Sequence, residues 1–119
     1  QQLSQVIYIA LLLITCYYCN YMDSAKKRIR YSDHLQFRLR LREIDAKLPE
    51  KIYRFTDERY YDRATGLLIA VKKVRSKGKF RDIAVTYRET DKEALLITIH
   101  PLKQRQKENR LQTNRWRKI

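Results

Sequence analysis

Three segments in the second half of the chain are rich in aliphatic and aromatic residues, and short polar links separate them. They cover Leu67–Arg75, Phe80–Arg88 and Ala94–His100. Apolar runs bounded by polar links are typical of β-strands, and links this short join antiparallel neighbours. The pattern predicts a three-stranded antiparallel meander, and Tyr60 and Tyr61 predict a short strand before it.

A helix is predicted ahead of the strands, from Ser32 to about Asp45. Ser32 is a good N-cap residue and leucines follow it. The same stretch also alternates apolar and polar residues as a strand does, but Leu, Arg, Gln and Glu dominate and β-branched residues are nearly absent, which favours a helix. A second, short helical turn is predicted from Pro49 to Phe55, because proline suits the first position of a helix.

These elements predict an α+β domain, with one or two N-terminal helices packed on a three- to four-stranded antiparallel sheet. After Pro101 the chain becomes polar, and residues 102–119 carry seven Lys or Arg against one Glu. This stretch is predicted to be a basic C-terminal tail, either a helix or an arm. With 119 residues, the chain has room for one domain at most.

Charge divides the chain into two unlike parts at Met22. All 27 Lys or Arg and all 13 Asp or Glu follow that residue, and the net charge is +14. Residues 22–119 are therefore predicted to be the basic domain and residues 1–21 an apolar leader. The leader is interpreted as upstream sequence outside the functional protein, as a membrane anchor with the domain in the cytoplasm, or as a helix packed on the domain.

The cysteines lie only in this leader, at Cys16 and Cys19. Their C-x-x-C spacing has no second pair or histidine cluster to complete a zinc site, and no thioredoxin-like context to support a redox motif. The domain contains no cysteine, so it does not depend on disulfides. A cytoplasmic location is the prediction, and a membrane partner is expected only if residues 1–21 act as an anchor.

No metal or cofactor is predicted. Gly66 and Gly78 are too few and too far apart for a Rossmann or Walker phosphate loop. Two histidines have no obvious third ligand, and the carboxylates are scattered and mostly beside basic residues, which disfavours a metal-dependent nuclease. Any phosphate would have to be held by side chains.

The basic composition favours a polyanionic partner, and RNA is the main prediction. A metal-free ribonuclease needs a base, an acid and cations for the phosphorane charge. The catalytic candidates are His100, at the end of a strand, with His34 and Tyr87. The phosphate- or RNA-binding candidates are Arg38, Arg42, Lys103, Arg110, Arg115 and Trp116.

The alternative hypothesis is a non-enzymatic module that binds nucleic acid or an acidic protein through the same face. For each histidine a structural or merely solvated role stays open. Convergence of His100, Tyr87 and an arginine of the tail would favour an enzyme, whereas an even basic sheet with the histidines apart would favour the binding module.

Several of these residues also resemble a known pattern. His34, Arg38, Arg42 and Ile44 resemble the H-x3-R-x3-R-x-I helix that opens a group of small, mostly uncharacterised prokaryotic domains. The strands over residues 83–87 and 96–103 and the ending over residues 109–116 are similar to the closing segments of that group. These domains are placed in the RelE-like, barnase-EndoU-colicin nuclease superfamily.

The resemblance implies a RelE-like α+β fold with its site on the sheet and an acidic partner, such as the antitoxin of a toxin-antitoxin pair. His34, Arg38, His100, Lys103 and Arg115 fall on the matching positions. The expected function is a toxin-type protein that targets RNA, as a metal-independent endoribonuclease. Related folds also include ParE-type toxins that act on gyrase, so the resemblance does not by itself choose the target.

Overall fold

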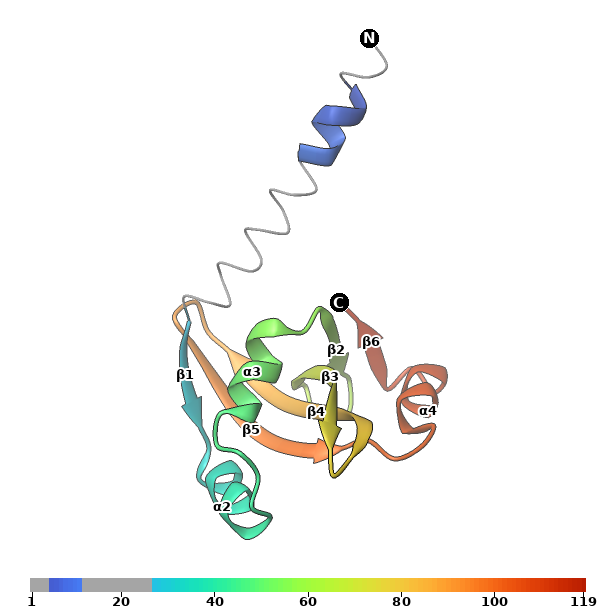
Figure 1. Ribbon diagram of the computed structural model, residues 1–119. Helices are drawn as coiled ribbons and strands as arrows, with labels where there is room; N and C mark the ends of the chain where they lie inside the picture. The colour runs from blue at the N-terminus through green and yellow to red at the C-terminus, as the bar shows by residue number, and fades with distance from the viewer. Residues whose placement is uncertain (1–4, 12–26) are drawn as a thin grey trace.

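Six strands form one mixed sheet in the order β1-β5-β4-β3-β2-β6 (Figure 1). The computed structural model describes residues 5–11 and 27–119 of the chain. The strands are β1 (Arg28–Tyr31), β2 (Glu58–Asp62), β3 (Leu68–Ser76), β4 (Lys79–Glu89), β5 (Glu93–Pro101) and β6 (Trp116–Lys118). The α+β class, the antiparallel meander β3-β4-β5 and the short strand before it are confirmed.

The prediction of only three or four antiparallel strands is wrong. A strand from Arg28 to Tyr31 pairs in parallel with β5, and the end of the basic tail forms β6, antiparallel to β2. Both are edge strands of three or four residues with few apolar side chains. Such strands form because a neighbouring strand offers unpaired backbone groups, and their own sequence carries little strand signal.

The β3–β4 link is a two-residue hairpin turn at Lys77 and Gly78. Both residues have positive φ, 52° and 79° respectively. This backbone matches the right-handed twist of the two strands, and glycine adopts it without a steric penalty. The turn therefore sets the register that runs from Leu68 opposite Tyr87 to Ser76 opposite Lys79.

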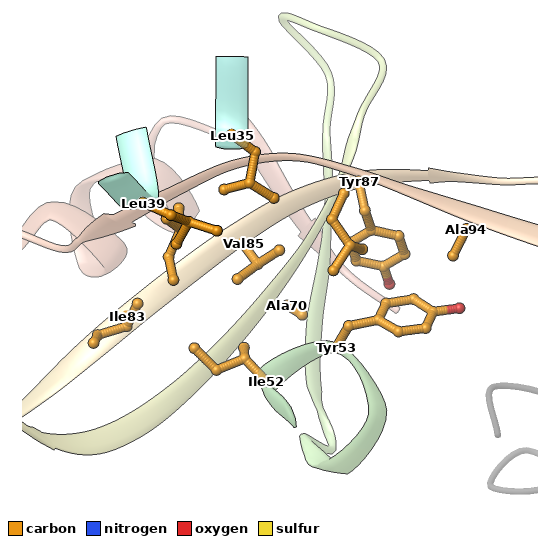
Figure 2. Close-up of a cluster of buried hydrophobic side chains, with 11 residues drawn as sticks. Leu35, Leu39, Ile52, Tyr53, Ala70, Ile83, Val85, Tyr87 and Ala94 are labelled. Carbon is orange, nitrogen blue, oxygen red and sulfur yellow. The ribbon is translucent and has the colours of Figure 1, made fainter. Parts of the chain in front are cut away.

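Helices α2 (Asp33–Leu41) and α3 (Leu48–Phe55) cover one face of the sheet. Figure 2 shows Leu35 and Leu39 of α2 and Ile52 and Tyr53 of α3 directed at the side chains of the central strands. The main core lies here and also includes Ala70, Ile83, Val85, Tyr87, Ala94, Leu96 and Ile99. The N-cap at Ser32 and the proline in the first turn of α3 are both confirmed.

The opposite face carries a smaller core beneath α4 (Gln106–Gln112). Leu111 of this helix packs against a cluster made of Tyr60, Ile69, Val71, Ala84, Leu102 and Trp116. The basic tail is thus a helix followed by a strand, and it covers the part of the sheet nearest β2 (Figure 1). The rest of this face, toward β5 and β1, has no helix over it among the described residues.

A further helix occupies residues 5–11 of the leader, and its apolar side chains are exposed. In the described ranges, no helix has both the length and the apolar character needed to cross a membrane. Cys16 and Cys19 lie outside the described residues.

Candidate phosphate-binding site

His100 lies on the sheet face that α4 partly covers. Its register partner on β4 is Ala84, and two residues earlier Thr98 is in register with Thr86. The hydroxyls of these two threonines are 2.6 Å apart. Because side chains alternate along a strand, Thr98 and His100 share one face, and the imidazole is half-buried there.

Ser32 attaches helix α2 to β5 beside this position. The Ser32 N–H donates to the Leu96 carbonyl, and its hydroxyl donates to the Ile97 carbonyl at 2.8 Å. Ile97 is the extra residue of a β-bulge, since Thr98 and Leu96 pair with the consecutive residues Thr86 and Tyr87. A bulge turns a carbonyl out of the regular ladder, so it is free to receive this bond.

The attachment places α2 along β5 beyond the end of β1 (Figure 1). Leu35 and Leu39 point into the main core. Arg38 and the C-cap residue Arg42, one turn later, lie close enough for their charges to act on His100. The bulge on β5 and the N-cap of α2 therefore determine the position of these two arginines.

The third cation near His100 is Arg110, which lies on helix α4. Lys107 holds this helix on the sheet, with its ammonium 2.8 Å from a Glu58 carboxylate oxygen and 3.6 Å from one of Asp82. Tyr60 donates to the same oxygen of Glu58 at 2.7 Å. Burial raises the pKa of Glu58, but the bonds from Lys107 and Tyr60 outweigh it and the pKa is lowered. One turn after Lys107, Arg110 acts on His100.

Three uncompensated positive charges thus act on His100. Arg38, Arg42 and Arg110 have no carboxylate within ion-pair distance in residues 27–119. Burial and then the charges of these arginines lower the pKa of His100 below its usual value. At neutral pH the imidazole is therefore a neutral base in a cationic setting, which is the arrangement that binds an anion and accepts a proton from it. We call these four residues the His100 site.

The lowered pKa gives a direct test of this electrostatic environment. Arg110→Ala is expected to raise the His100 pKa toward its ordinary value of about 6.5, because one repelling charge is removed. Imidazole resonances of His100 followed by NMR across pH would report the change. Arg81→Ala, an exposed arginine on the other face of β4, is the matched control and should leave His100 unchanged. A His100 pKa above 6.5 in the unmodified protein would contradict the described environment.

Tyr87 is not part of this site. Its ring is 1% exposed on the opposite face, edge-on to Tyr53 at 4.9 Å, and its hydroxyl accepts from Arg59 at 3.0 Å. Burial raises the pKa of Tyr87, so it stays protonated. The expected convergence of Tyr87 with His100 fails because the two side chains project from opposite faces of the sheet. Of the tail arginines, Arg110 lies close enough for its charge to lower the pKa of His100.

Two candidates from the tail have structural contacts. Arg115 forms a two-bond ion pair with the buried Asp62, at 3.1 and 3.2 Å. Burial raises the pKa of Asp62, but the bonds from Arg115 and the Ala64 N–H outweigh it and the pKa is lowered. Trp116 is 5% exposed and stacks on Tyr60 at 5.3 Å. These two residues fasten β6 to the sheet: the Arg115 guanidinium is paired with Asp62, and Trp116 is too buried to stack on an RNA base in this conformation.

His34 and Lys103 lie at the margins of the site. His34 is exposed at the start of the stripe that continues to Arg38 and Arg42. The Lys103 side chain is exposed, while its backbone N–H donates to the Gln106 side chain at 2.9 Å before α4 begins. No sequence motif marks Lys107 or Glu58, which position α4. The alternation of β5 does place Thr98 and His100 on one face of the strand.

The fold and this site define a small, basic α+β protein with a cationic histidine site on its sheet. Within the described ranges, no three His, Cys, Asp or Glu side chains gather where they could hold a metal ion. No family model, curated protein or solved structure matches the chain.

Proposed function

We propose that the protein is a metal-independent endoribonuclease that cleaves RNA at the His100 site. The observation that carries the proposal is a half-buried histidine with a lowered pKa, surrounded by three arginines that no carboxylate neutralises within residues 27–119. Guanidinium groups bind phosphate oxygens and stabilise the negative charge that develops on phosphorus in the transition state.

The chemistry follows from these groups. Neutral His100 takes the proton of a ribose 2′-OH, and the 2′-oxygen forms a bond to the adjacent phosphorus. The bond from phosphorus to the 5′-oxygen breaks, and this oxygen takes a proton from water or from an acid, for which His34 is the candidate. The products are a 2′,3′-cyclic phosphate and a 5′-hydroxyl, and Arg38, Arg42 and Arg110 hold the phosphate oxygens throughout.

The proposal includes a toxin-type role in the cytoplasm with an acidic antitoxin or another acidic protein as partner. An acidic partner suits a chain of net charge +14 whose arginines at the His100 site have no carboxylate of their own within residues 27–119. In a host cell, induced expression of the full chain should slow growth, and the His100→Ala chain should not.

The second candidate is a module that binds nucleic acid or an acidic protein without cleaving it. It is favoured by the position of Tyr87, which leaves His100 without a second proton-transfer group in hydrogen-bond contact among the described residues. Both candidates use the same cations, so binding alone does not separate them.

A cleavage assay on the purified full chain separates the two candidates. We expect cleavage of unstructured RNA that persists in a metal chelator and leaves a 2′,3′-cyclic phosphate, which phosphatase and mass spectrometry would identify. RNA carrying 2′-O-methyl groups is the control, because it keeps the phosphates and lacks the nucleophile. Binding without cleavage over a broad panel of RNAs, with and without divalent metal, would reject the enzyme and leave the binding module.

A further inference from the structure

A second group of arginines lies on the same sheet face as His100, further along β4 and β5. Arg30 on β1 and Arg88 on β4 are both in register with Leu95 on β5. Residues in register on neighbouring strands point to the same side of a sheet. The two guanidinium groups therefore flank Leu95 across two strand spacings, or about 10 Å at the backbone. We call Arg30 and Arg88 the arginine row.

The row is exposed and keeps a positive charge. Arg88 has no ion-pair partner within residues 27–119, and Arg30 has only Glu93 at 3.6 Å, with its own side chain 60% exposed. A pair this open to solvent is weak and yields readily to a stronger anion. Arg28, exposed and in register with Glu93, offsets the charge of that carboxylate.

The row and the His100 site are separated along one pair of strands. Arg88 lies four residues along β4 from Ala84, the register partner of His100, which corresponds to roughly 13 Å. The threonine pair of Thr86 and Thr98 lies between them, and no helix covers this stretch in the described part of the chain. Two cationic positions on one open strip suit an anion that carries more than one phosphate.

We infer that the arginine row is a second phosphate subsite, which holds a flanking phosphate of a single-stranded RNA whose scissile phosphate lies at His100. This inference rests on the proposed function. The strand must be unpaired because attack by the 2′-oxygen needs it in line with the leaving 5′-oxygen, and paired nucleotides in a regular helix do not reach that geometry. Side-chain contacts to phosphate without base contacts make the subsite tolerant of sequence.

The test compares the unmodified protein with Arg88→Ala on two RNAs, a dinucleotide with one phosphodiester and an unstructured octanucleotide. Arg88→Ala should lower kcat/KM on the octanucleotide about tenfold, as expected for one lost charged contact, and leave the dinucleotide unchanged. The slope of log affinity against log salt should fall by about 0.7 on the octanucleotide. Arg81→Ala, on the same strand but the other face, is the matched control and should change neither.

Binding to a 2′-O-methyl octanucleotide, measured by fluorescence anisotropy, tests the row independently of cleavage. Failure of the proposed function would appear as no cleavage of either RNA, while loss of binding in Arg88→Ala alone would still support the row. Equal losses in Arg88→Ala and Arg81→Ala would overturn the subsite in favour of diffuse charge. Equal affinity for a duplex of the same length would overturn the assignment to single strands.

Discussion

Replacing His100 by alanine is expected to lower the rate of RNA cleavage by about 10² to 10⁴-fold, the usual loss when a general base is removed. Affinity for RNA should change little, because Arg38, Arg42 and Arg110 remain to hold phosphate. Single-turnover cleavage would give the rate, and anisotropy with the 2′-O-methyl octanucleotide would give the affinity. His34→Ala on α2 is the companion variant, and its smaller effect would measure a role in protonating the leaving oxygen.

The pH dependence of the cleavage rate is a second measurement on the His100→Ala variant. The base must be deprotonated, so the rate should rise with pH through the His100 pKa, and that pKa is lowered by burial and by the three arginines. The midpoint of the rise should therefore lie below the ordinary histidine pKa of about 6.5. Residual cleavage by His100→Ala should lack this rise. An unchanged rate and pH profile in His100→Ala would remove His100 from the mechanism.

The largest effect on stability is expected from Leu35→Ala, which should lower the free energy of unfolding by about 2–5 kcal/mol. Leu35 has no exposed surface and fills the space between α2 and the sheet (Figure 2). Truncation removes the transfer free energy of its methyl groups and leaves a cavity that the sheet beneath closes only in part. Urea unfolding followed by circular dichroism would measure the loss.

Leu41→Ala is the matched control on the same helix. Its side chain is 67% exposed, so the change in unfolding free energy should stay within about 0.5 kcal/mol. Leu35→Ala should also weaken the attachment of α2, and with it the hold of Arg38 on its place near His100. Equal losses in the two variants would show that α2 does not pack on the sheet through its Leu35 side.

Local patterns in the sequence determine much of this protein. The meander follows from apolar runs and short links, and the start of α2 follows from a serine that can accept the Leu35 N–H. The spacing of Arg38 and Arg42 by four residues places them on one stripe of a helix. These features depend on residues near one another in the chain, where backbone geometry alone sets the outcome.

The tertiary structure decided which candidates meet. Tyr87 and His100 lie on neighbouring strands but on opposite faces, because His100 pairs with Ala84 and Tyr87 lies three residues from Ala84, and this register is not visible in either strand alone. Arg110, Arg115 and Trp116 all lie in the basic tail. Asp62 pairs with Arg115 and Tyr60 stacks on Trp116, whereas the charge of Arg110 acts on His100. β1 and β6 depend on pairing with distant strands. The composition of the chain shows how many cations it carries. Long-range strand pairing and burial determine which of these cations remain without a carboxylate partner near His100.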